Sequence, residues 1–293
     1  MNTYKSYERL VEPARPTSEL WRLASSIVLV VVIFLAANVA YFNFLRGTPD
    51  WHNLSRELEN GSTARSVLWM LASFGGLFAA LAIALRVMHR RPISSLFGGF
   101  PACFADFWLT LRLAMVLFGI VLILPSPADF TPERAMDFVP WLMLAPMSLA
   151  AILFQITTEE LVFRGYLQSQ LAARFSSPWV WIVLPSALFA ALHYDPSTYG
   201  ENAILVAAWA GLFGLAAADL TARSGNLGPA LALHFANNVS AIMFVSTKDY
   251  WDGLALYVVP FGPKDTEFVA AVLPLEGLVI LCGWLVARIA IRR

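Results

Sequence analysis

The sequence has few charged residues. Only 14% of its 293 residues are Asp, Glu, Lys or Arg, whereas 58% are hydrophobic. Because a soluble domain has about 25% charged residues, this composition excludes the ordinary soluble class and indicates a polytopic membrane protein. The formal net charge is zero, so there is no broad basic field for nucleic acid, and we expect no nucleic-acid partner.

Cysteines and several familiar protease motifs are also scarce or missing. Cys103 and Cys282 are far apart and lack metal-ligand spacing, so we interpret both as packing residues. The chain has no His-Glu-x-x-His helix, no Gly-x-Gly-Asp run opposite a second intramembrane aspartate, and no Gly-x-Ser-x elbow paired with a later histidine. These absences argue against the corresponding protease designs.

Eight apolar stretches approach the roughly 20 residues that cross the hydrocarbon core of a bilayer. They are residues 23–45, 66–88, 107–124, 140–160, 179–194, 202–222, 227–246 and 268–288. The fourth continues as a helix to about residue 174, and the fifth is short. We therefore predict an all-α polytopic membrane protein with about eight transmembrane helices.

The first apolar stretch and the basic residues predict the orientation. Residues 23–45 are too long for a signal-peptide core and precede no small-residue cleavage site, so we expect them to remain as the first span. With a cytoplasmic N-terminus, 14 of the 20 Lys and Arg residues fall on the cytoplasmic side. We expect a multi-pass protein of the cell (inner) membrane with both termini cytoplasmic.

The stretch 156–166 places three ionisable residues inside an apolar sequence. Charged side chains within spans are costly and mark functional positions. On a helix, Glu160 and Arg164 lie one turn apart on the same face, while Glu159 points about 100° away. We predict an ion pair between Glu160 and Arg164 and expect Glu159 to face a cavity. The alternative is a solvated helix end at the membrane interface.

Two of the four histidines, His193 and His234, lie in apolar stretches. One such histidine is usually a packing residue, but two together with a diacid indicate a site. Glu160 and His193 each lie 16 residues from the hairpin tip at Ser176–Ser177, or about 24 Å at 1.5 Å per residue. His234 lies roughly 13 Å beyond the turn at 224–226 by the same rise. We predict one buried polar site in the C-terminal half, nearer the cytoplasmic face.

A carboxylate, two imidazoles and an amide in a wet pocket suit peptide hydrolysis. A glutamate in low dielectric can take a proton from water and pass it to a leaving amine. One histidine can orient that water, while the second histidine and Asn238 can donate to a developing oxyanion. Alternatively, Glu159, His193 and His234 can hold a divalent metal, such as Zn, that activates the water. The residues leave both mechanisms open.

Three motifs resemble the CAAX prenyl endopeptidase and bacteriocin-processing family of membrane proteins, also called CPBP or Abi. Glu-Glu-x-x-x-Arg matches residues 159–164, Phe-x-x-x-His matches Phe189 to His193, and His-x-x-x-Asn/Asp matches His234 to Asn238. They occur in the family's order over about eighty residues. The resemblance implies an all-helical intramembrane endopeptidase core with a cavity open to the cytosol.

The resemblance also implies a role for each motif residue. Glu159 would be the water-activating base with His193 beside it, while His234 and Asn238 would stabilise the oxyanion. The family is described both as metal-dependent and as glutamate-dependent, and we favour the latter because the site shows few other obvious ligands. The remaining motif residues would be structural, namely Glu160, Arg164 and Phe189.

These observations divide the chain into four expected segments. They are a cytoplasmic N-terminal segment (1–22), an N-terminal transmembrane scaffold (23–139), the protease core (140–246), and a last loop with the final transmembrane helix (247–293). The expected partners are a peptide or lipid-modified protein substrate and membrane lipids. The alternative functions are a non-catalytic scaffold or bacteriocin-immunity protein that retains the protease fold, and a transporter with a proton-coupled Glu/His relay. The lack of inverted repeats argues against the transporter.

Overall fold

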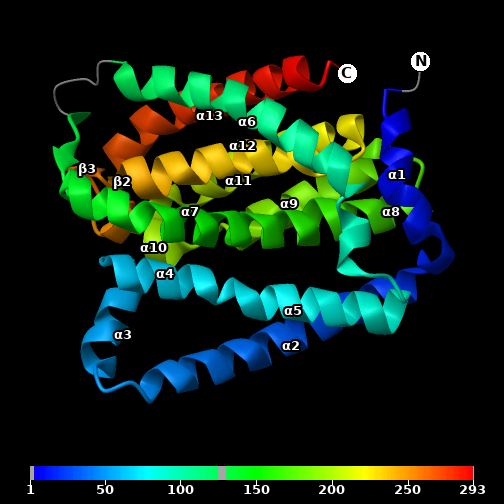
Figure 1. The fold of residues 1–293 in the computed structure, drawn as a ribbon, viewed down its shortest axis with the longest axis horizontal. Helices are drawn as coiled ribbons and strands as arrows, with labels where there is room; N and C mark the ends of the chain where they lie inside the picture. Colours follow the sequence, from blue (N-terminus) through cyan, green and yellow to red (C-terminus); the bar gives the residue numbers. More distant parts are fainter. Residues whose placement is uncertain (1–2, 125–129, 293) are drawn as a thin grey trace.

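The computed structural model describes residues 3–124 and 130–292. Its long helices run roughly along one axis, with both chain termini at one end and the short strands at the other (Figure 1). We call these the termini end and the strand end. Helix α2 (Leu20–Arg46) packs on α5 (Phe74–Ala84), and these two helices, together with α3 (Trp51–Asn60) and α4 (Ala64–Ala72), lie to one side of the remaining helices in Figure 1.

Among the described residues, six helical segments are long and apolar enough to cross a membrane. This confirms a multi-pass integral membrane protein. The segments are Leu20–Arg46, Ala64–His89, Phe100–Ile123, Phe138–Arg174, Pro196–Ser224 and Thr266–Ile291.

The other two predicted spans are helical but short. Residues 179–194 form the helix Trp179–Leu192, and residues 227–246 form α12 (Gly228–Val239) with the π-helical η9 (Ser240–Phe244). Both are shorter than the roughly 20 residues that a span requires. The prediction of about eight spanning helices is therefore confirmed for six.

The elements between and within these segments have the following bounds. They are η1 (Lys5–Tyr7), α1 (Glu8–Val11), η2 (Glu12–Thr17), α3 (Trp51–Asn60), α4 (Ala64–Ala72), η3 (Leu85–His89), η4 (Ile93–Leu96), α6 (Phe100–Ile123), α7 (Phe138–Glu160), η6 (Leu161–Leu167), α8 (Gln168–Arg174), η7 (Trp179–Val183), α9 (Leu184–Leu192), α10 (Pro196–Tyr199), η8 (Gly200–Asn202), α11 (Ala203–Ser224), η10 (Asp252–Leu254) and α13 (Thr266–Ile291).

Helix α12 is the centre of the C-terminal half. It packs against α6, α7, α11 and α13, and most of its side chains are buried. Small residues allow this close approach: a Cβ at Gly228 would collide with the carbonyl oxygen of Cys103 on α6, and Ala230 and Ala232 are fully buried. A helix surrounded by protein does not need to match the bilayer thickness, which explains its short length.

Three short strands at the strand end were not predicted. They are β1 (Glu133–Arg134), β2 (Val245–Thr247) and β3 (Tyr257–Val259), arranged β1-β3-β2 with β1 antiparallel and β2 parallel to β3. Segments of two or three residues are too short to show strand periodicity in a sequence. The fold is otherwise all-α, as predicted.

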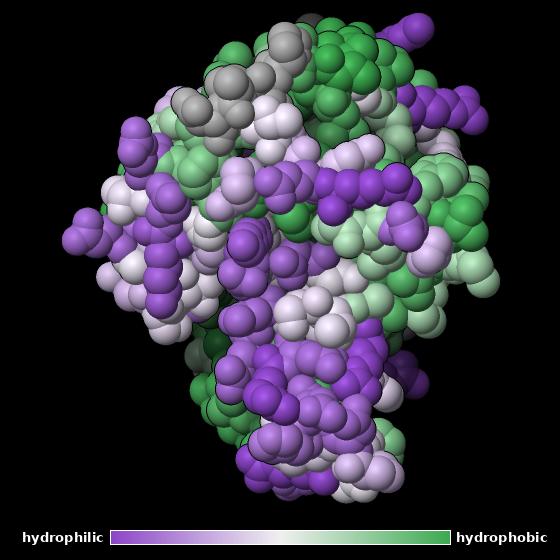
Figure 2. Space-filling view, turned by 90° about the vertical axis from the view of Figure 1, so that its left-hand side faces the viewer, coloured by the Kyte–Doolittle hydropathy of each residue, from purple (hydrophilic) through white to green (hydrophobic). Residues whose placement is uncertain are grey.

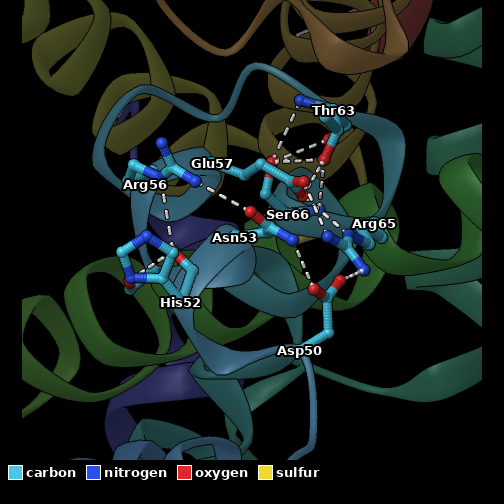
Figure 3. A network of polar contacts seen from close by, with 9 residues as sticks. Asp50, His52, Asn53, Arg56, Glu57, Thr63, Arg65 and Ser66 are labelled. Atoms are coloured by element: carbon cyan, nitrogen blue, oxygen red, sulfur yellow. Dashed lines mark hydrogen bonds and ion pairs between the residues drawn. The ribbon is translucent and has the colours of Figure 1, made fainter.

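The strand end is hydrophilic, in contrast to the flanks of the bundle (Figure 2). Part of this polar surface is a network around the loop from α3 to α4 (Figure 3). Arg65 pairs with Asp50 and with Glu57, each at 2.6 Å, and Thr63 caps α4 by accepting from the Ser66 amide. The hydrogen bonds from Arg65 hold the pKa of the Glu57 carboxyl below its usual value. These contacts order the turn between the first two spans.

The N-terminal segment folds back onto the termini end. Tyr7 stacks on Trp181 at a centroid distance of 5.2 Å, and Tyr4 meets the same ring edge-on at 5.4 Å. Leu10 and Ala14 are fully buried. The segment is therefore a packed part of the fold.

Candidate active site

The diacid lies at the end of α7. Glu160 is the last residue of α7, and the helix then continues without interruption into the π-helical η6. Arg164 Nη1 donates to Glu160 Oε1 at 2.9 Å, and the two side chains are 1% and 0% exposed. The predicted ion pair is therefore present, and it is buried. Local π-helical widening of this kind occurs frequently at functional sites.

Aromatic rings from η6 itself and from two other helices surround the Arg164 guanidinium. Its Cζ lies 4.7 Å from the ring centroid of Phe189 on α9, 5.8 Å from that of Phe163 on η6 and 6.0 Å from that of Phe213 on α11. Cation–π contacts stabilise an arginine whose charge has been removed from water. Arg164 thus joins η6 to α9 and α11.

His234 on α12 lies between the two glutamates. Its Nδ1 is 2.8 Å from Glu160 Oε1, a hydrogen bond in which the ring nitrogen donates to the carboxylate. Its Nε2 is 3.6 Å from Glu159 Oε2, which is too long for a hydrogen bond. Glu160 is thus held by both Arg164 and His234, whereas Glu159 lies beside the ring without being bound to it. The Glu159 side chain is 15% exposed.

Phe213 packs directly on the His234 ring, at a centroid distance of 4.7 Å. It is 2% exposed and comes from the Ala- and Gly-rich α11, which does not belong to any of the three motifs. Sequence reasoning missed it. The sequence feature that could have indicated it is the pair of large aromatic residues, Trp209 and Phe213, one turn apart among small residues. In the structure their rings stack at a centroid distance of 6.4 Å.

His193 follows the last residue of α9. Its Nδ1 is 2.8 Å from the backbone oxygen of Phe189 and can donate to it, which leaves Nε2 as the acceptor in the neutral ring. The Phe189 ring lies 4.4 Å from the His193 ring and 6.3 Å from the His234 ring, between the two histidines. In the part of the chain that the structure describes, the hydrogen bonds of His193 do not include one to Glu159.

Comparison with known proteins identifies a family for part of the chain. Residues 140–240 match the family described as Type II CAAX prenyl endopeptidase Rce1-like. The chain has an Rce1-like (CPBP/Abi) family domain. The chain is also similar to a Bacillus subtilis (strain 168) protein described as "Uncharacterized protein YyaK", with 26% identity over 256 residues and 82% coverage of each chain. No solved structure matches the chain.

The Rce1-like domain contains all three motifs, so the family resemblance is confirmed. Its last motif residue, Asn238, is held by two neighbours. Asn238 Nδ2 donates to Gln155 Oε1 at 3.2 Å, and Asn237 Nδ2 donates to Asn238 Oδ1 at 3.2 Å. This arrangement orients the Asn238 carboxamide and leaves it one N–H for another acceptor.

Gln155 was not identified from the sequence. It is 6% exposed and precedes Glu159 by one helical turn, so both side chains lie on the same face of α7. A buried amide in an apolar span needs a hydrogen-bond partner. The position of Gln155 in an apolar stretch could therefore have indicated a polar contact there.

The candidate metal ligands in the Rce1-like domain do not fit a metal ion. Glu159 Oε2 and His234 Nε2 lie 3.6 Å apart, but these two atoms are fewer ligands than a protein-bound zinc ion requires. Across residues 3–124 and 130–292 no group of three or more His, Cys, Asp and Glu side chains could hold a metal ion. We therefore derive no step through a metal.

A second buried histidine, besides His234, lies outside the Rce1-like domain. His89, at the end of η3, is 3% exposed, although sequence reasoning placed only two histidines in spans. Its Nε2 is 3.0 Å from Ser26 Oγ and 2.9 Å from the Tyr166 hydroxyl, and its Nδ1 is 2.9 Å from Thr17 Oγ1. His89 thus connects the N-terminal segment, α2 and η6.

Proposed function

We propose that the protein is a membrane endopeptidase that hydrolyses a peptide bond in a peptide or lipid-modified protein. The proposal rests on the contact of one histidine with two glutamates from another helix, inside a domain of a protease family. Three polar groups that are costly in a membrane are thereby concentrated in one place. Two further atoms support a reactive site, because Glu160 Oε2 and Arg164 Nη2 are buried without a partner among the described residues.

In the proposed reaction, Glu159 accepts a proton from a water molecule whose oxygen attacks the scissile carbonyl carbon. The C–N bond then breaks, and the proton on Glu159 passes to the departing nitrogen, giving a carboxylic acid and an amine. We assign His193 to the orientation of the water. His234 and Asn238 donate hydrogen bonds to the oxyanion, His234 from Nε2 in its doubly protonated form because Nδ1 is bound to Glu160.

We assign the other parts of the chain to supporting roles. Glu160, Arg164 and Phe189 hold the site together, and residues 23–139 act as a scaffold for the core at 140–246. Residues 1–22 and 247–293 flank these two parts. We place the protein in the cell (inner) membrane with both termini in the cytoplasm, where basic residues predominate.

The test compares Glu159→Gln with Glu59→Gln in purified protein. Glu59 is an exposed carboxylate on α3 and serves as the matched control. With a fluorogenic peptide, lipid-modified or unmodified, we expect kcat of Glu159→Gln to fall by about 10² to 10⁴ and that of Glu59→Gln to stay unchanged. Unchanged turnover in Glu159→Gln would remove Glu159 as the base. Folded wild-type protein without activity on either peptide would favour the non-catalytic scaffold.

A further inference from the structure

Two adjoining hollows lie between α11 and α13, outside the three motifs. One has a volume of about 300 Å³ and is lined by apolar residues that include Trp209 and Pro274. The other, of about 360 Å³, reaches Asp219 and Trp284 near the termini end. Leu212 and Gly277 line both hollows. Together they form one continuous depression, which we call the α11–α13 groove.

The groove has the length of an acyl chain. Its lining on α11 runs from Leu205 to Asp219. This is about 21 Å at 1.5 Å per residue, more than the roughly 15 Å thickness of one hydrocarbon leaflet. On α13 the lining runs over the same number of residues, from Ala270 to Trp284. A chain lying along the groove would therefore reach from the headgroup level past the bilayer centre.

One end of the groove is polar, and its carboxylate is fully engaged. Asp219 accepts hydrogen bonds from Arg223 Nε at 2.9 and 2.7 Å, from the Tyr4 hydroxyl at 2.9 Å and from Trp284 Nε1 at 2.8 Å. Tyrosine and tryptophan are enriched at the membrane–water interface. These contacts place the polar end of the groove at headgroup level.

A second arginine at this end has no carboxylate partner in residues 3–124 and 130–292. The Arg288 guanidinium lies 4.8 Å from the Trp284 ring centroid, and its Nε is buried without a hydrogen-bond partner among the described residues. Asp219 balances Arg223, which leaves the charge of Arg288 in excess. An apolar groove that ends at an uncompensated arginine is complementary to a lipid with an apolar chain and an anionic headgroup.

We propose that the α11–α13 groove binds one acyl chain of an anionic phospholipid, whose phosphate group pairs with Arg288. The lipid covers the apolar surface between the two helices and supplies the missing anion. The inference is independent of the proposed peptidase activity, because none of the residues involved belongs to the proposed catalytic site.

Native mass spectrometry of the purified full-length protein, titrated with phosphatidylglycerol or phosphatidylcholine, tests this site. Gly277→Phe fills the middle of the groove, since a Cβ at Gly277 would have no heavy atom within 4 Å. Gly119→Phe is the matched control because Gly119, on α6, has the same open surroundings. We expect at least a tenfold loss of phosphatidylglycerol affinity in Gly277→Phe and no loss in Gly119→Phe.

The headgroup is tested separately with Arg288→Gln and, as control, the exposed Arg292→Gln one turn later. We expect Arg288→Gln to lower phosphatidylglycerol affinity by about fivefold without changing phosphatidylcholine affinity, and Arg292→Gln to have no such effect. Equal affinities of the wild type for the two lipids would overturn the proposal. So would equal losses in the two glycine variants, or displacement of the lipid by a lipid-modified peptide, which would assign the groove to substrate.

Discussion

Two buried histidines of this protein have opposite surroundings. His234 is 5% exposed and His89 is 3% exposed, and both ring nitrogens of each have close polar neighbours. The neighbours of His234 are carboxylates, whereas those of His89 are hydroxyl groups and the Gln170 amide.

The difference concerns the charge of the groups that surround each ring. His234 has a carboxylate beside each ring nitrogen, so this ring lies among the groups that we assign to the proposed reaction. The hydrogen-bonding neighbours of His89 are neutral and come from several elements, so this ring is suited to joining segments. Burial alone therefore does not distinguish the two histidines, whereas the charge of their partners does.

The largest effect is expected from Arg164→Met, which removes the cation that holds Glu160 beside His234. We expect the free energy of unfolding to fall by about 3–5 kcal/mol, because a buried carboxylate loses its ion-pair partner. Arg15→Met is the control, since the Arg15–Glu8 pair is exposed, with a cost of about 0–1 kcal/mol. Denaturant unfolding in mixed micelles measures both. Equal losses of unfolding free energy in the two variants would show that the buried ion pair stabilises the protein no more than the exposed one.

His234→Leu and His89→Leu test the comparison directly. We expect His234→Leu to lower kcat by about 100-fold, equivalent to about 2.7 kcal/mol, because the oxyanion donor and the neighbour of Glu159 are lost. The measurement is steady-state peptide hydrolysis per folded protein. If His89→Leu lowered turnover equally, the distinction between the two histidines would fail.

His89→Leu should act on stability instead. We expect a loss of about 1–3 kcal/mol, because the hydroxyl groups of Ser26 and Tyr166 lose a buried partner. Thermal unfolding in detergent, together with turnover that stays within about twofold of wild type, checks this prediction. Ser148→Ala is a suitable reference, since its buried hydroxyl donates to the Leu144 oxygen within α7 and so joins no separate elements.

Gln155→Leu should lower turnover less than His234→Leu does. We expect kcat to fall about tenfold with KM unchanged, because Asn238 loses the acceptor that orients its amide. Gln155→Glu retains an acceptor oxygen and should recover most of the activity. The combination of Gln155→Leu with Asn238→Ala should be no worse than Asn238→Ala alone. Additive losses would show that Gln155 does not act through Asn238.

The smallest effect concerns Asp195, a partly exposed carboxylate two residues after His193. Hydrogen bonds from Ser197 and Thr198 lower its pKa from 3.8 to about 2. Because the folded-state pKa is depressed, its contribution to stability is present above about pH 4 and is lost as the pH falls towards 2. Asp195→Ala should cost about 0.5–1 kcal/mol at neutral pH, as for other helix N-caps. The measurement is the free energy of unfolding of wild type and Asp195→Ala at a series of pH values. A difference between them that stayed constant as the pH fell would contradict this expectation.

Several features were predictable from the sequence because they depend on composition over short stretches. Six of the eight predicted apolar spans are present, and the ion pair between Glu160 and Arg164 follows from their spacing on one helix. The stretches 179–194 and 227–246 are helices but are shorter than predicted. For α12 the reason is its position inside the bundle, which composition does not reveal.

Other features depend on contacts between distant segments. The sheet at the strand end joins β1 to β3 across more than a hundred residues, and its strands are too short to leave a pattern. Gln155 and Phe213 belong to no motif, and their contacts with Asn238 and His234 exist only because α7, α11 and α12 pack together. His89 was missed for the same reason, since its partners come from other elements.

The sequence by itself determined which stretches enter the membrane and which polar residues they include, because the hydrophobic effect and the cost of a buried charge act on local composition. Only the tertiary structure decided how those residues are paired. His234 meets Glu160 across 74 positions of sequence. Such a contact depends on how helices cross and rotate against one another, and spacing along a single helix does not specify either.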